Sequence, residues 1–248
     1  MRERAAMCRT MLVIALVLGL AAPVMAQEWI EYQNIQDGFK INFPGQPKIM
    51  DTTWVTGQGY VLPARIYSGE MGSSRYSMTV VDYNVIERLG MERSEKCPVG
   101  AETCQGQPAG QLRSVIGPGY ATQEIRDALL NATYKLLQRD AKLTALLWNF
   151  EDLVEGYELH LVNNKDQSRT MAFVAMHENK LYVMEGTVPK GYPEPGLFYQ
   201  SLGWVDKNGN GIRYQQVYVN EFHGLRIIPV PPRAGQNPAP QPPPAAAR

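Results

Sequence analysis

The stretch GFKINFPGQP, residues 38–47, decides the fold. Phe39, Ile41 and Phe43 alternate with polar residues, which is the two-residue period of a strand with one buried face. The Pro-Gly pair that follows them is typical of a turn. The stretch therefore predicts a strand that ends in a tight turn.

Short runs of strand-forming residues surround this first strand. Three follow it closely and are separated by glycine-containing turns, at residues 48–55, 64–71 and 75–83. Four more come later, with Asn- and Asp-containing turns, at residues 146–150, 157–162, 170–176 and 180–187. Connections this short join neighbouring antiparallel strands, so the sequence predicts two meanders. A short helix after residue 193 and a last strand at 212–219 complete the pattern.

One long helix is predicted between the two meanders, over residues 122–143. Ile125, Leu129 and Leu136 recur at helical spacing, and the segment contains no Gly or Pro. Thr122 can cap its first turn. Because the strands do not alternate regularly with helices, the pattern predicts an α+β fold, an antiparallel β-sheet flanked by helices, rather than a parallel α/β sheet.

Both ends of the chain are predicted to lie outside the folded domain. Residues 1–26 combine a basic start, an apolar run of 14 residues and the small residue Ala26, which is typical of a cleaved secretory signal peptide. An uncleaved anchor is the alternative, but a spanning helix needs about 20 apolar residues. Residues 229–248 are rich in proline and predict a disordered tail. Residues 27–228 remain as a single α+β domain of an exported, periplasmic protein.

The composition excludes some classes of partner. Apolar residues make up 44% of the chain and charged residues 19%, which is enough to build a sizeable core. Basic and acidic residues number 24 each, so the basic excess of nucleic-acid-binding proteins is missing. We therefore expect no nucleic-acid partner and, after removal of the signal peptide, no association with membranes.

Two cysteines, Cys97 and Cys104, remain after the predicted cleavage. They lie in a segment rich in Gly and Pro, and an oxidising compartment favours a disulfide that closes this loop. Free thiols, or a metal or redox role, are the alternatives. A metal would need further thiolates or nearby histidines.

One segment resembles half of a calcium-binding loop. Asp206, Asn208 and Asn210 stand at the ligand positions of such a loop, with Gly211 at the position of its sharp turn. Val217, however, stands where the bidentate Glu is needed. We therefore interpret the segment as a plain turn.

The side chains that could support catalysis are scattered. The mature chain has neither a Gly-x-Ser-x-Gly elbow nor, with the disulfide formed, a free cysteine. His160 and His177 are interpreted as ordinary surface or edge residues. Glu151, Asp152 and Glu155 are interpreted as solvated loop charges, with a carboxylate pair for glycoside chemistry as the alternative. The sequence thus predicts no catalytic, cofactor-binding or metal-binding residue.

Three segments carry a family resemblance. Residues 38–47 resemble the "GF.I.FPG.P" opening of the PsbP-like superfamily, and residues 180–184 and 197–202 resemble its closing strand and "F..S" helix. The superfamily includes exported bacterial members of uncharacterised function. The resemblance implies a PsbP-like α/β sandwich and a binding or accessory role, and it carries over no functional residue.

Tyrosine is the predominant aromatic residue, with 13 tyrosines against six phenylalanines. Tyrosine and tryptophan combine an apolar ring with a polar group and are enriched at interfaces. Tyr182, Tyr199 and Trp204 are therefore the first candidates for a binding surface. The alternative for these residues is cross-strand packing inside the fold.

These observations predict an exported, non-enzymatic binding or accessory protein. Its expected partner is another envelope protein or a small ligand. Two alternatives stay open: an exported enzyme whose site is assembled from scattered carboxylates and tyrosines, and an envelope-tethered structural protein that uses the Pro-rich tail as a spacer.

Overall fold

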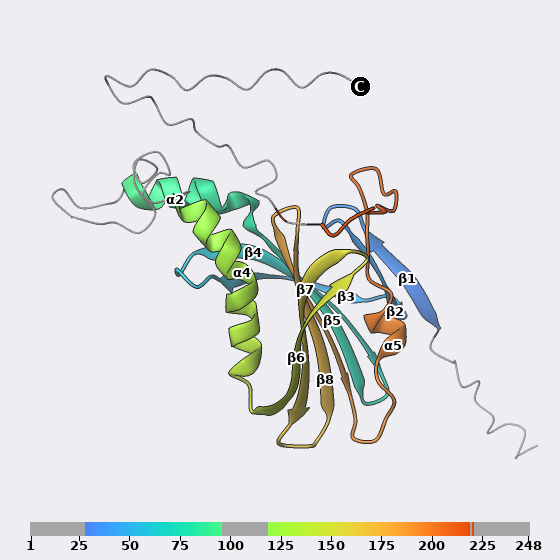
Figure 1. Cartoon of the computed structure of the whole chain (residues 1–248). Coiled ribbons are helices and arrows are strands. Elements are labelled where there is room, and N and C mark those ends of the chain that lie inside the picture. Colours follow the sequence, from blue (N-terminus) through green and yellow to red (C-terminus); the bar gives the residue numbers. More distant parts are fainter. Residues whose placement is uncertain (1–27, 96–118, 219, 221–248) are drawn as a thin grey trace, which may run out of the picture.

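Two antiparallel sheets form the body of the protein in this computed structural model, which describes residues 28–95, 119–218 and 220 (Figure 1). The larger sheet has the strand order β3-β4-β5-β9-β8-β7-β6 and the smaller one the order β1-β2-β10. Strand β5 pairs with β9, so the two predicted meanders join into one seven-stranded sheet. The predicted signal peptide, the Cys97–Cys104 pair and the Pro-rich tail lie outside the described residues.

The strands of the larger sheet are β3 (Lys48–Val55), β4 (Val61–Met71), β5 (Ser74–Asp82), β6 (Ala141–Glu151), β7 (Val154–Asn163), β8 (Arg169–His177) and β9 (Lys180–Val188). Those of the smaller sheet are β1 (Trp29–Asn34), β2 (Phe39–Pro44) and β10 (Gly203–Trp204). The helices are α2 (Ile86–Glu95), α4 (Gly119–Leu137) and α5 (Gly196–Tyr199), with a 3-10 turn, η1, at Tyr83–Val85.

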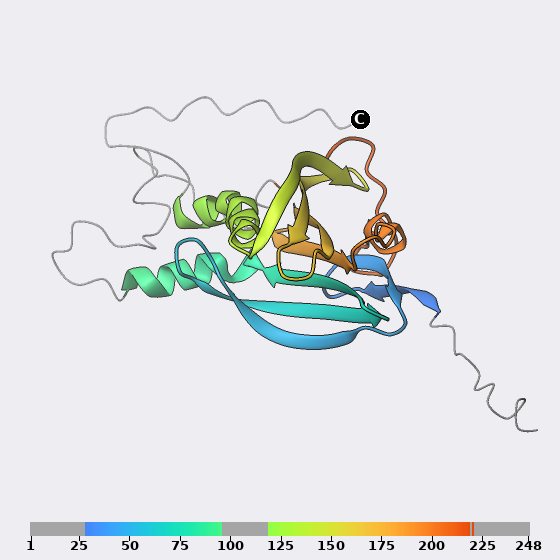
Figure 2. The same ribbon diagram turned by 90° about the horizontal axis from the view of Figure 1, so that it is seen from below.

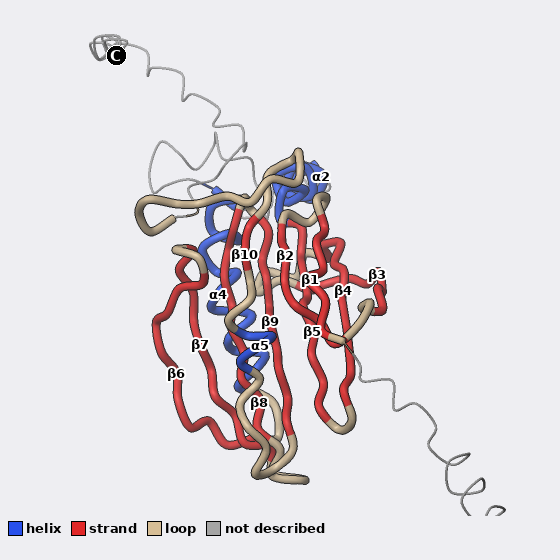
Figure 3. The backbone as a smooth tube through the Cα atoms, turned by 90° about the vertical axis from the view of Figure 1, so that its right-hand side faces the viewer, coloured by secondary structure: helices blue, strands red, loops and turns tan. Residues whose placement is uncertain are grey.

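Each face of the larger sheet has its own core. On one face, α4 lies over β8 and its neighbours β7 and β9, with α2 beside it (Figure 2). On the other face lie the smaller sheet and α5 (Figure 3). Strand β9 supplies both cores, because Leu181 and Val183 point to the α4 side while Tyr182 and Met184 point to the smaller sheet. The expected antiparallel architecture is confirmed, and the helices flank the sheet only in part.

Within the stretch 38–47, residues Phe39–Pro44 form β2, as predicted. Phe39, Ile41 and Phe43 are fully buried and pack between the two sheets. Gly38 has φ +74°, a conformation that favours glycine, and lies where the chain enters the strand. The alternation of residues 39–43 thus supplies the buried face that joins the smaller sheet to the larger one.

The structure corrects several predicted elements. Helix α4 spans Gly119–Leu137 and not residues 122–143, so Thr122 lies inside the helix and not at its cap. The segment after Leu137 turns at once into β6, which starts at Ala141. The predicted strand at 212–219 is not formed in its described part, residues 212–218, where the β-pairing is limited to isolated bridges at Gly211 and Tyr218. Strand β1 and helix α2 were not predicted.

In the described part of the chain, no helix is long and apolar enough to cross a membrane.

Candidate functional site

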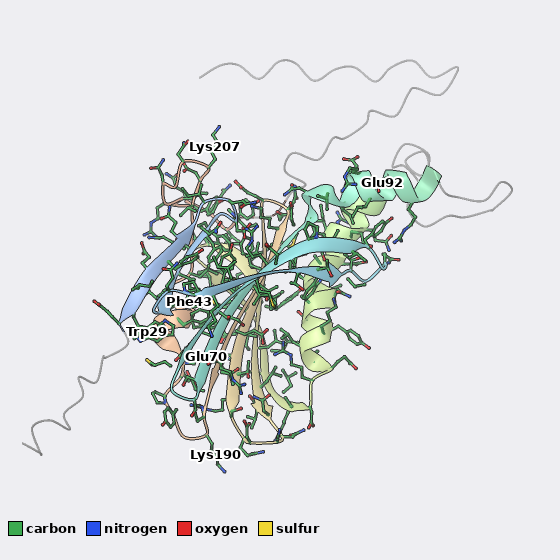
Figure 4. All side chains as sticks on the ribbon, turned by 180° about the vertical axis from the view of Figure 1, so that it is seen from behind. Trp29, Phe43, Glu70, Glu92, Lys190 and Lys207 are labelled. Carbon is green, nitrogen blue, oxygen red and sulfur yellow. The ribbon has the colours of Figure 1, made fainter. Side chains whose placement is uncertain are left out.

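A polar cleft of about 530 Å³ opens on the α4 side of the larger sheet, beyond the C-terminal end of the helix. Glu185 and Thr187 continue the face of β9 whose earlier residues pack under α4, and here that face is polar. Figure 4 labels Glu70, which lines the cleft from β4. The lining comprises Ser68, Gly69, Glu70, Arg75, Tyr76, Ser77, Arg139, Asp140, Asn163, Lys165, Asp166, Ser168, Thr170, Glu185 and Thr187.

Strand register places the polar side chains of the floor in two transverse rows. In one row Ser77 pairs with Ser68 on one side and with Glu185 on the other. In the next row Thr187 lies between Arg75 and Thr170. Two pairs of consecutive strands that are far apart in sequence, β4–β5 and β8–β9, thus bring hydroxyl and charged groups to one floor.

An ion pair joins the helix end to this floor. Arg139 follows α4, and its guanidinium donates two hydrogen bonds to the Glu185 carboxylate, with Nη2 3.0 Å from Oε1. The bonds and charge of Glu185 raise the pKa of Arg139 above its ordinary value and outweigh the effect of burial. This two-point contact fixes the wall of the cleft relative to the sheet.

Two other acidic groups of the lining already accept hydrogen bonds from neighbouring loop residues. Asp140 Oδ1 accepts from Asn164 Nδ2 at 2.7 Å. Asp166 Oδ1 accepts from the backbone N–H and the hydroxyl of Ser168, at 3.0 and 2.7 Å, and these bonds hold its pKa below the ordinary value. The carboxylates of Asp140 and Asp166 therefore help to hold the loops that border the cleft.

Two cations of the lining differ from these carboxylates. Arg75 at the start of β5 and Lys165 in the β7–β8 turn are both exposed, and neither forms an ion pair within 4.0 Å in the described part of the chain. Hydroxyl and amide groups lie beside them: Thr170 Oγ1 is 2.8 Å from Thr187 Oγ1 and accepts from Asn163 Nδ2 at 3.2 Å. The cleft therefore offers two exposed cations and hydrogen-bonding groups beside its carboxylates, and the charge of Arg75 also contributes to the lowered pKa of Asp166.

The sequence analysis missed this cleft. Alternate polar residues at positions 75, 77 and 79, and again at 185 and 187, do signal a strand face that turns from apolar to polar. The pairing of β5 with β9, which unites the two segments, depends on contacts between residues about 100 positions apart and is not visible in either segment alone.

The expected binding surface of Tyr182, Tyr199 and Trp204 is not formed. The three side chains are 1%, 5% and 0% exposed and belong to the core between the two sheets. Tyr182 donates a hydrogen bond to the backbone oxygen of Asp37 at 2.5 Å, and Trp204 Nε1 donates to that of Glu151 at 3.1 Å. The cross-strand packing alternative describes these residues.

His177 was interpreted as a surface or edge residue, and the structure shows that this is wrong. Its side chain is fully buried and stacks on Trp204, with the ring centroids 4.4 Å apart. Its Nε2 lies 2.6 Å from the hydroxyl of Tyr214. Tyr214 and Tyr218, from the segment that was predicted as a strand, contact the His177 ring.

A second polar cluster lies on the opposite face of the sheet. Glu158 is buried, and its carboxylate contacts His160 Nε2 and Asn149 Nδ2, each at 2.5 Å. Burial raises the pKa of Glu158, but these bonds outweigh it and hold the net pKa below the ordinary value. Burial, followed by the charges of Glu158 and Asp152, raises the pKa of Glu151 to about 7.

Glu151 and Glu155 were interpreted as loop charges, but they lie in β6 and β7, and the alternative of a carboxylate pair is not formed by these two. Glu151 and Glu155 lie on opposite faces of the β6–β7 hairpin, because they pair with Val154 and Phe150, respectively, at adjacent positions. Glu155 accepts a hydrogen bond from Trp148 Nε1 at 3.2 Å, and Asp152 pairs with Arg213 at 3.1 Å.

The half calcium loop is a turn in the structure. The Asp206 carboxylate accepts from the backbone N–H groups of Asn208 and Asn210, at 2.8 and 2.9 Å, and Gly209 has φ +83°. Across the described residues, no group of three or more His, Cys, Asp or Glu side chains is arranged to hold a metal ion.

Comparisons with known proteins give a distant likeness to solved structures. The sequence matches no known family's sequence model and no curated protein. Among solved structures, the chain is similar to the solution structure of cyanobacterial PsbP (CyanoP) from Synechocystis sp. PCC 6803, at 14% identity over 70% of this chain and 87% of that chain, with a TM-score of 0.34. At this TM-score the likeness is weak, and membership of the PsbP-like superfamily remains a prediction from residues 38–47, 180–184 and 197–202.

Proposed function

We propose that this protein is an exported, non-enzymatic binding protein that takes a small polar anion in the cleft beneath the end of α4. The cleft's size supports this proposal, because pockets of about 300–1,000 Å³ suit small ligands. The observation that carries it is the pair of exposed cations, Arg75 and Lys165, set among hydroxyl groups. The neighbouring carboxylates of Asp140 and Asp166 already accept hydrogen bonds from other groups of the protein. Such a lining favours a carboxylate or phosphate that also bears hydrogen-bonding groups.

The chemistry of the lining supports binding over catalysis. Its serine and threonine hydroxyls are accompanied by no histidine or cysteine among the lining residues. A hydroxyl nucleophile needs an adjacent base to be activated. The enzyme alternative has its best support at Glu151 and Glu158 on the other face, where two carboxyl groups have divergent pKa values.

Thermal denaturation with millimolar citrate, gluconate or inorganic phosphate tests the ligand class. A ligand that binds only the folded state raises the midpoint, so at least one probe should raise it by several degrees. Charge reversal at both cations, Arg75→Glu with Lys165→Glu, should abolish the rise. Lys207→Glu is the matched control, because Lys207 is exposed and does not line the cleft. Figure 4 shows it well apart from Glu70, which does line the cleft. The proposal would be refuted if the Arg75→Glu, Lys165→Glu double variant showed the same rise in midpoint as the Lys207→Glu control. It would also be refuted if no probe raised the midpoint of the wild type.

Export is tested separately. The protein recovered from an envelope fraction should begin at Gln27, because the predicted signal peptide ends at Ala26. N-terminal sequencing measures this directly. Intact Met1 on membrane-bound material would instead support an anchor.

A further inference from the structure

Strand β6 is an edge of the larger sheet (Figure 3). It also carries large apolar side chains that are exposed. The exposed residues are Leu143 (38%), Leu146 (45%), Leu147 (51%), Trp148 (59%) and Phe150 (42%). One row of backbone N–H and C=O groups on an edge strand faces outward and can pair with another chain. A long edge strand that carries exposed apolar side chains is therefore a surface for strand pairing.

The register of β6 with β7 assigns each side chain to a face. Leu143, Leu146, Trp148 and Phe150 lie on the α4 side, as do their partners Leu161 and Leu159. Lys142, Ala145, Leu147, Asn149 and Glu151 lie on the other side. A bulge between Leu143 and Ala145 inserts Thr144 as the extra residue, so Lys142 and Glu151 share a face although they are nine residues apart.

We propose that β6 pairs antiparallel with β6 of a second copy of this chain, about a two-fold axis at Leu147, which joins the two seven-stranded sheets. A two-fold axis perpendicular to the sheet keeps every side chain on its own face, so only residues of the same face can meet. With Thr144 left in the bulge, Leu147 meets its own copy. Trp148 then meets Leu146, Phe150 meets Leu143, Asn149 meets Ala145, and Glu151 meets Lys142 of the second copy.

The charges of β6 favour a second copy as the occupant. Lys142, near its start, and Glu151, at its end, are the charged residues of the strand. Neither forms an ion pair in the part of the chain that the structure describes. A strand with opposite charges at its two ends is complementary to a second, antiparallel copy of itself. The two-fold axis therefore produces two Lys142–Glu151 pairs.

The opposite edge of the sheet lacks this arrangement. In β3, Asp51 already pairs with Arg65 at 3.0 Å, and Lys135 covers the ring of Trp54. Lys48 is exposed at the start of β3, which makes it a matched control for charge reversal on an edge strand.

Sedimentation of the purified protein at 1–100 µM tests the dimer. The wild type should be dimeric at the upper concentrations, and Lys142→Glu or Glu151→Lys should each weaken the dimer at least about tenfold, because like charges then face each other twice. The double variant exchanges the two charges and should restore the dimer to within about threefold of wild type. Lys48→Glu should leave it unchanged.

Circular dichroism of each variant shows whether the fold is retained. A wild type that is monomeric at 100 µM would overturn the proposal. So would a folded Lys142→Glu variant that dimerises as well as wild type, or a folded double variant that stays monomeric. The test is independent of ligand binding in the cleft, because Lys142 and Glu151 do not line it.

Discussion

Trp204 illustrates how one residue can join the two sheets. Its indole stacks on His177 and meets the ring of Tyr182 edge-on, with centroids 4.9 Å apart. Its Nε1 also donates to the backbone oxygen of Glu151, at the end of the edge strand. A buried aromatic ring that satisfies its polar group contributes to packing and to orientation at once.

Trp204→Ala should therefore lower the free energy of unfolding by about 3–5 kcal/mol, the usual cost of removing a buried aromatic side chain. Chemical denaturation measures this change. Leu197→Ala is the control, because Leu197 is 63% exposed and its truncation should cost well under about 1 kcal/mol. A loss as small for Trp204 as for Leu197 would contradict its place in the core.

Glu124 of α4 is a buried acid, with 1% of its surface exposed. Burial, followed by the charge of Asp127, raises its pKa above the ordinary 4.5. The folded state therefore binds the proton more tightly than the unfolded state, so this group lowers stability as the pH rises above 4.5.

Glu124→Gln removes this pH dependence. The variant should gain stability relative to wild type as the pH rises from 4 to 8, by on the order of 1 kcal/mol at the upper end. Denaturation curves at several pH values measure the difference. A difference that is constant or that shrinks with rising pH would contradict the buried-acid account.

At the scale of elements, alternation predicted the strands well and helix ends poorly. Strand β3 has the predicted bounds, and β2 has its three buried residues at the predicted positions. The end of α4 was missed because the turn after Leu137 contains neither Gly nor Pro, while apolar residues continue into β6. The cleft and the burial of Tyr182 could not be predicted, because both depend on which distant strands become neighbours.

The contact between the α5 segment and β9 requires a residue without a side chain at Gly186. A Cβ added at Gly186 would lie 2.7 and 2.8 Å from the ring carbons of Pro195, which is too close for carbon atoms. Gly186→Ala should therefore push the α5 segment away and cost about 1–3 kcal/mol. Gly196→Ala, where nothing lies within 4 Å of the added Cβ, should be close to neutral. Equal stability of the two variants would contradict the packing of this segment on the sheet.

At the scale of the whole molecule, the larger sheet offers two surfaces that can be used together. The cleft opens on the face of the sheet, whereas pairing at β6 extends the sheet in its own plane. Dimerisation would thus leave both clefts accessible. The core toward the smaller sheet holds most of the buried aromatic side chains, and both β2 and β9 contribute residues to it.

The central claim is that the cleft binds a small polar anion, and an amide NMR titration of the purified protein with citrate, gluconate and phosphate in turn tests it most directly. The account predicts that at least one probe produces saturable shift changes concentrated on cleft residues such as Arg75, Ser77 and Thr187. Amides of β6, including Leu147, should remain unchanged. Saturable changes centred elsewhere, or none with any of the three anions, would contradict the account.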